Sequence, residues 1–179
     1  MSPGCTIEVA VACSGWTRLC PAAEALVRNA AKLAFARGTT LLALSWPGPV
    51  EFGITLADAE KQRQLNRDYR GHDGSTNVLA FPSWEPDTHL PPGAPVLLGD
   101  VVLALETVGR EAAEQGKPLD DHLRHLTVHG VLHLLGFDHV TQADAAMMES
   151  VERAILAELE VPDPYLDTIS LLEPKASER

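Results

Sequence analysis

The feature that most constrains this chain is an apolar helical run carrying three histidines, VHGVLHLLGFDH, at residues 128–139. Residues four apart share one face of a helix, so His129 and His133 present two imidazoles about 6 Å apart along the axis. Gly136 favours the left-handed conformation that ends a helix. A chain that turns back there would bring His139 to the same point. The sequence therefore predicts a histidine helix followed by a sharp reversal.

Three imidazoles that converge on one point are typical of a zinc site with a fourth position open to water, as in catalytic zinc. The predicted ligands are His129, His133 and His139. His125 lies about 12 Å along the axis from His133, so one ion cannot bind both. We predict that His125 and His122 lie on the surface or support the ligands. The alternative is that all these histidines belong to a packed or exposed helix face without a metal.

The spacing H-x-x-x-H-x-x-G-x-x-H is also that of the metzincin zinc proteases. Those enzymes use a Glu directly after the first histidine as general base, and this chain has Gly130 there. Glycine has no side chain that can accept a proton. The run therefore predicts a zincin-like ligand scaffold but argues against peptide hydrolysis.

Hydrophobic periodicity elsewhere indicates an α+β fold, with about four or five strands of mixed direction and about five helices packed on the sheet. Apolar runs predict strands at residues 7–14, 39–46, 50–56, 77–84 and 98–105. Helical spacing and helix caps predict helices at residues 21–37, 58–69, 106–115, 118–136 and from 142 onward. The predicted capping pairs are Thr55 with Asp58 and Thr141 with Asp144.

With 179 residues and 45% hydrophobic content, the chain is long enough to bury a core and is not disordered throughout. We expect one domain over residues 1–165 and a disordered Pro- and charge-rich tail at 166–179. Cys5, Cys13 and Cys20 fit neither a disulfide framework nor a zinc ribbon, so they are expected to be buried small apolar residues in a reducing compartment. The absence of a signal sequence or transmembrane run predicts a cytoplasmic protein with no membrane partner.

The net charge of −11 argues against bulk coating of nucleic acid, but it allows a local basic groove. Arg63, Arg67 and Arg70 form one stripe on a helix, at i, i+4 and i+7. Such a stripe could follow a phosphate backbone, with the planar guanidinium of Arg70 on the phosphate under attack. From the residues alone, a solvated helix face explains the stripe equally well.

The string HGVLHLLGFDH resembles the signature H-G-x-L-H-L-x-G-[YF]-D-H of the YbeY family, bacterial metal-dependent endoribonucleases that act in ribosomal RNA maturation. Further strings resemble the family in the same order, from about residue 56 to 165: LNRDYR at 65–70, STNVLAFP at 75–82, LGDVVLAL at 98–105, Met148 with Glu152, and DPY at 163–165. Ser75 and Ala80 depart from the usual Pro and Ser, and the Pro-rich loop 85–95 is longer than expected.

By this resemblance, His129, His133 and His139 bind one Zn²⁺, and Arg70 is the basic residue of the catalytic site. The resemblance implies a zinc-dependent, single-strand-specific endoribonuclease that matures the 3′ end of small-subunit ribosomal RNA and acts in ribosome quality control. It also implies ribosomal RNA, the small ribosomal subunit and assembly factors as partners. The alternatives are a metal-stabilised assembly factor with little nuclease activity and, disfavoured by Gly130, a metalloprotease. The general base, the attacking group and the oligomeric state stay open.

Five polar or aromatic residues near these strings have two interpretations each. Asn66, Thr76 and Asn77 either contact substrate or stabilise a strand end. Asp138 either orients a ligand histidine or caps the turn before His139. Trp84 either stacks on a base or packs on the core.

Overall fold

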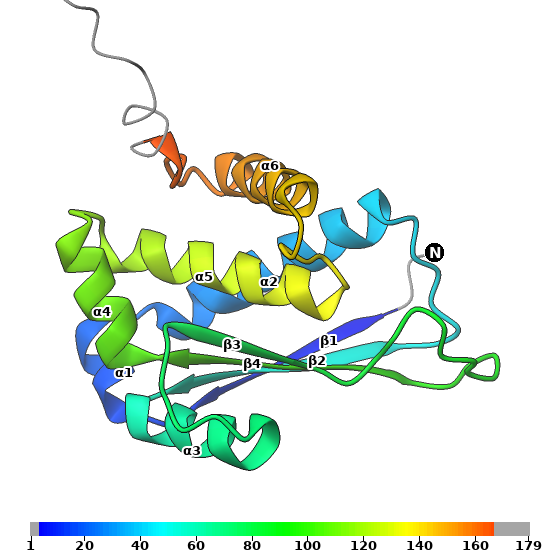
Figure 1. Cartoon of the computed structure of the whole chain (residues 1–179), viewed down its shortest axis with the longest axis horizontal. Coiled ribbons are helices and arrows are strands. Elements are labelled where there is room, and N and C mark those ends of the chain that lie inside the picture. The colour runs from blue at the N-terminus through cyan, green and yellow to red at the C-terminus, as the bar shows by residue number, and fades with distance from the viewer. Residues whose placement is uncertain (1–3, 167–179) are drawn as a thin grey trace, which may run out of the picture.

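The computed structural model describes residues 4–166 (Figure 1). Its elements along the chain are β1 (Cys5–Val11), α1 (Ser14–Leu19), α2 (Ala23–Leu41), β2 (Val50–Ala57), α3 (Ala59–Arg70), β3 (Val78–Pro82), β4 (Val96–Ala104), α4 (Leu105–Glu114), α5 (Leu119–Leu134) and α6 (Gln142–Glu158). The predicted α+β class with a mixed sheet is confirmed. From residue 167 onward the predicted tail lies outside the described residues, and the domain boundary at 165 stays a prediction.

The four strands form one sheet in the order β1-β2-β4-β3. Strands β1, β2 and β4 are parallel, and β3 runs antiparallel to β4 at one edge. Helices α2 and α5 cover one face of the sheet, α6 packs on α5 as an outer layer, and α3 lies on the opposite face (Figure 1). In the central strands β2 and β4 most residues are buried, and the exposed positions are Glu51, Leu97 and Asp100. Helix α5, which carries the histidines, crosses β3 and β4 directly.

The predicted strand at residues 39–46 is wrong. Helix α2 continues through Leu41, with the Thr40 hydroxyl donating to the Ala36 carbonyl at 3.0 Å, and the chain then turns at Ala43, which has φ of 50°. The apolar and β-branched residues suit a strand locally, but packing of α2 against α5 and β1 decides the conformation. Propensity is a weak guide where tertiary contacts oppose it.

The short helix α1 was not predicted, so the structure has six helices within residues 4–166 instead of about five. Trp16 anchors α1, since its ring is fully buried and its Nε1–H donates to the Ala57 carbonyl at 2.8 Å. Such a long-range anchor leaves no periodic signal in six residues. None of the helices described here is both long enough and apolar enough to cross a membrane.

The predicted helix caps are partly confirmed. Thr141 and Asp144 form a reciprocal capping box that begins α6. Asp58 caps α3 by accepting from the Lys61 backbone N–H at 2.7 Å, whereas Thr55 lies within β2.

All three cysteines are free. Cys20 is buried as predicted, with its thiol donating to Asp120 at 3.1 Å, while Cys5 and Cys13 are half-buried. The prediction of full burial holds only for Cys20.

Gly130 is the point where α5 comes closest to the sheet. A Cβ atom at this position would lie 2.6 Å from Val101 Cγ1 on β4 and 3.3 Å from Val78 Cγ2 on β3. Real Cβ atoms do not approach another carbon so closely, so only glycine lets the helix backbone rest on these strands. The residue that replaces the protease base is thus required for packing.

We expect Gly130→Ala to lower the free energy of unfolding. Crowding against Val101, a β-branched side chain with few alternative rotamers, costs about 1–3 kcal/mol, against a gain in helix propensity of at most about 1 kcal/mol. Gly109→Ala in α4 is the matched control, because a Cβ there meets nothing within 4 Å. In urea unfolding, the free energy of unfolding should therefore fall for Gly130→Ala and rise for Gly109→Ala. Equal stabilisation of both would contradict the close approach of α5.

Candidate metal centre

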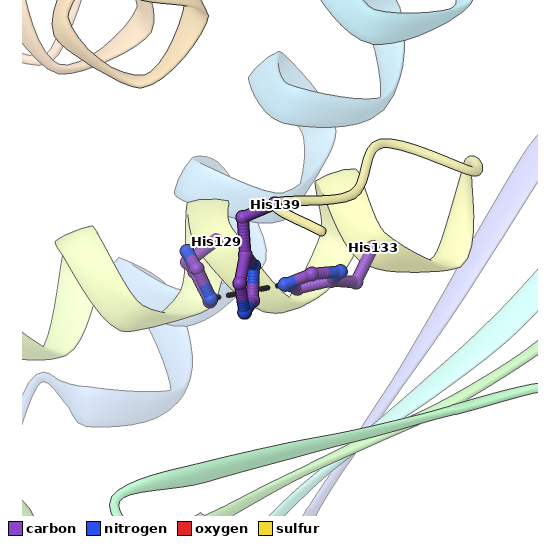
Figure 2. Close-up of side chains that lie close together, drawn as sticks. All are labelled: His129, His133 and His139. Atoms are coloured by element: carbon purple, nitrogen blue, oxygen red, sulfur yellow. Dashed lines mark hydrogen bonds between the residues drawn. The ribbon is translucent and has the colours of Figure 1, made fainter. Parts of the chain in front are cut away.

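The three predicted histidines converge at the C-terminal end of α5 (Figure 2). His129 and His133 project from the helix, and His139 returns from the loop that follows it. Gly136 has φ of +105°, a conformation that glycine adopts at little cost, and this residue reverses the chain. One ligand nitrogen from each ring lies within 4.8 Å of the others. The spacing in the sequence thus produces the predicted cluster.

The donor set fits a single divalent metal ion. His129 Nε2 and His133 Nε2 are 3.1 Å apart, close to the roughly 3.3 Å expected between two nitrogens bound tetrahedrally to zinc. Burial and then the neighbouring His129 and His139 lower the pKa of His133 to about 4. This imidazole is therefore neutral at pH 7, and the neutral form is the one that binds metal. His139 is exposed, which leaves one side of the cluster open to solvent.

A buried carboxylate stands behind the first ligand. Glu152, on α6, is fully buried, and its Oε1 lies 2.5 Å from His129 Nδ1. Burial alone would raise the pKa of Glu152, but hydrogen bonds from His125 and His129 outweigh it and hold this pKa at about 2. The ionised carboxylate accepts the Nδ1 proton of His129, which leaves Nε2 free for a metal. The Tyr165 hydroxyl donates to the other carboxylate oxygen.

The role of Glu152 in orienting a histidine was not predicted from the sequence. Its signal is a carboxylate on the apolar face of α6, between Met148 and Ile155, where a charge is costly unless paired. Asp138, considered for that role, instead accepts from the backbone N–H of His139 at 2.7 Å, so it caps the turn.

The two histidines excluded as ligands are not on the surface. His125 is 3.5 Å from the Glu152 carboxylate and 3.4 Å from the Tyr165 hydroxyl, so it supports the ligands indirectly. His122 is buried and bonds to Glu111 at 2.8 Å.

We expect Glu152→Gln to weaken zinc binding about 10- to 100-fold, because the amide retains the shape of the carboxylate but loses its charge. Competition against a chromophoric chelator measures this affinity. Glu149→Gln, a partly exposed position on the same helix, is the matched control and should keep the wild-type affinity. Unchanged affinity in Glu152→Gln, with unchanged thermal unfolding of the metal-free protein, would contradict the orienting role.

The histidines open into a cleft of about 430 Å³ between α5, the edge strand β3 and the loop after Gly136. Arg70, at the end of α3, lines the same cleft. Its guanidinium donates to the Ala80 carbonyl of β3 and lies 5.0 Å from the centre of the Phe81 ring. The four predicted site residues therefore share one cavity, although Arg70 comes from the opposite face of the sheet.

The rest of the predicted arginine stripe does not line this cleft. Arg63 is paired with Asp73 at 2.7 Å and with Glu60 at 3.7 Å, so its charge is compensated. Arg67 is exposed on the surface of α3. Of the three arginines in the stripe, Arg70 alone lines the cleft, and its guanidinium is held in place by Ala80 and Phe81.

The remaining polar and aromatic candidates have structural partners. Asn66 donates to a carbonyl of the following loop at 2.9 Å, and Asn77 donates to the Glu111 carboxylate at 3.0 Å. The backbone N–H of Thr76 donates to the side-chain oxygen of the buried Gln62 at 2.8 Å. Trp84 packs edge-on against another tryptophan, with ring centres 4.8 Å apart. These contacts favour a structural role for Asn66, Asn77 and Trp84, although Asn66 lies within α3 and not at a strand end.

Comparison with known proteins shows which family this chain is similar to. The family model described as Endoribonuclease YbeY matches residues 23–160. A protein named Endoribonuclease YbeY from Paramagnetospirillum magneticum is 51% identical over 164 residues, covering 89% of this chain and 96% of that protein. One of the same name from Rhodospirillum rubrum is 49% identical over 154 residues, covering 85% and 77%.

A similar fold is found in the solution structure of TM1509 from Thermotoga maritima. The two chains superpose with a TM-score of 0.54 at 20% sequence identity, and the match covers 97% of this chain and all of the other. At this identity the likeness supports the fold alone.

Proposed function

Since the chain belongs to the YbeY family of endoribonucleases, we propose that it is a zinc-dependent, single-strand-specific endoribonuclease. We propose further that it matures the 3′ end of small-subunit ribosomal RNA and acts in ribosome quality control. The family supports the endoribonuclease activity itself. The observation that carries the metal dependence is the convergence of His129, His133 and His139 in one cleft with Arg70.

The side chains present divide the work of phosphodiester cleavage. Zinc held by the three imidazoles would lower the pKa of a water towards about 7 and polarise a phosphoryl oxygen. Arg70 would bind the phosphate through its planar fork and stabilise the charge that develops on it. Contacts with Ala80 and Phe81 hold the guanidinium in advance, so little reorganisation is needed when the phosphate arrives.

Peptide hydrolysis is disfavoured by the packing of α5. The helix position that holds the protease base is Gly130, and any side chain there would meet Val101 and Val78. A carboxylate could not occupy this position without moving the helix off the sheet. RNA differs from a peptide in carrying its own nucleophile, the 2′-hydroxyl, whose proton would have to pass to another group in the cleft or to solvent.

We propose the partners of this chain on the basis of its net charge and of its resemblance to the family. A net charge of −11 does not favour tight binding of RNA through the protein surface alone. We propose that the chain meets its RNA on the small ribosomal subunit, with assembly factors, in the cytoplasm. Pull-down of the tagged protein from growing cells, followed by sedimentation, tests this by asking whether it travels with small-subunit particles.

Metal-loaded protein should cut a single-stranded RNA that ends in the small-subunit 3′ sequence, spare the same sequence in a duplex, and stop when a chelator is added. A 2′,3′-cyclic phosphate on the product would show attack by the 2′-hydroxyl, and its absence attack by water. RNA that is bound but never cut would overturn the nuclease proposal in favour of a binding factor. Chelator-sensitive cleavage of casein would revive the protease alternative.

A further inference from the structure

A second cavity of about 510 Å³ lies between α3 and the sheet, on the other side of the edge strand β3. Arg70 and Pro82 line both this cavity and the metal cleft. The two hollows therefore meet at the edge of β3, where the Arg70 guanidinium bonds to the Ala80 carbonyl. We call the second cavity the α3 cavity. An RNA strand bound at the histidines could pass over the edge of β3 into it.

The walls of the α3 cavity suit a flat ring. Tyr69 is 76% exposed, and its ring centre lies 6.0 Å from that of Phe81 at an interplanar angle of 61°. Leu65 and Val102 add apolar surface. An exposed aromatic ring beside an apolar hollow offers the stacking surface on which single-stranded nucleic acid binds its bases.

The charged side chains suit different parts of a nucleotide: Asp100 in the α3 cavity suits a base, and Arg70 at the junction suits a phosphate. Asp100 lines the α3 cavity and is the acidic residue in its wall. A carboxylate repels phosphate but accepts hydrogen bonds from the amino and imino groups of a base edge. Thr55 and Ser83 add hydroxyl groups to the same wall. Arg70, at the junction, is the group suited to phosphate.

We propose that the α3 cavity binds the base of a nucleotide next to the scissile phosphate, stacked on Tyr69 with its polar edge toward Asp100. This inference rests on the proposed nuclease function and deepens it. A base can enter the cavity only after it has left its stack and its pair, which costs a few kcal/mol in a duplex and little in a single strand. The cavity thus supplies a physical reason for single-strand specificity.

The test uses a short single-stranded RNA with one cleavage site and matched RNAs lacking the base on either side of the cut. For wild type, removal of one of these two bases should lower kcat/KM about tenfold. Tyr69→Ala should cut the intact RNA about tenfold more slowly but should not distinguish it from that abasic RNA. Such non-additivity indicates that ring and base interact, since a general structural defect would slow both substrates equally.

Two variants sharpen the result. Tyr69→Phe retains the ring and should retain the dependence on the base. Leu41→Ala removes an exposed apolar side chain at the end of α2 and should behave as wild type. Equal cleavage of intact and both abasic RNAs by wild type would overturn this inference alone. Failure of metal-loaded wild type to cut any RNA would overturn the proposed function, and the base site with it.

Discussion

His133→Ala is expected to lose its bound metal and to cut RNA at least about a thousand-fold more slowly than wild type. The imidazole is half-buried, neutral at pH 7 and 3.1 Å from the nitrogen of His129, so its removal leaves two ligands, one of them exposed. A catalytic metal ion typically contributes several kcal/mol of transition-state stabilisation, and each 1.36 kcal/mol corresponds to about tenfold in rate.

Metal content and cleavage should be measured on the same preparation of each protein. His89→Ala is the matched control, because His89 is exposed in the Pro-rich loop and does not line the metal cleft. Thermal unfolding of metal-free wild type and variant shows whether the fold survives the substitution. A folded His133→Ala that still binds one equivalent of zinc would contradict the three-histidine site.

Arg70→Ala is expected to keep its metal and to lower kcat about 100- to 1000-fold, the usual cost of removing one preorganised donor from a transition state. Arg70 is exposed and its hydrogen bond goes to a strand carbonyl, so the loss should leave the fold intact. Arg70→Lys keeps the charge without the planar fork and should recover only part of the rate.

The control for this variant is Arg67→Ala, which removes an exposed cation from the same helix without touching the cleft. It should cut at the wild-type rate. If Arg70→Ala and His133→Ala both leave a trace of cutting unchanged, that cutting comes from a contaminating nuclease. The protein would then be interpreted as a binding factor with a structural metal.

Features that depend on a few neighbouring residues could be predicted from the sequence. The spacing of His129 and His133, the reversal at Gly136 and the capping box at Thr141 each follow from hydrogen bonds or geometry within one or two helical turns. Most strands and helices were found because their apolar periodicity is also local. The strand expected at 39–46 failed where α2 continues instead, because contacts distant in sequence oppose the local pattern.

The metal cleft as a whole required the tertiary structure. Residue spacing alone left the role of Arg70 evenly balanced, and only the family resemblance assigned it to the catalytic site. Nothing local shows that α3 reaches across β3 to the histidines on the opposite face of the sheet. The same holds for Asn77, Asp138 and Trp84, whose partners decided between two interpretations.

The sequence by itself determined which histidines converge, because the four-residue spacing puts His129 and His133 on one helix face and Gly136 lets the chain return with His139. Only the tertiary structure paired Glu152 with His129, joined the α3 cavity to the metal cleft at Arg70, and showed that Gly130 lets α5 rest on the sheet. The physical reason is the separation along the chain between the residues that interact. Local spacing is encoded in a few consecutive residues, whereas these contacts depend on how elements far apart in the chain pack together.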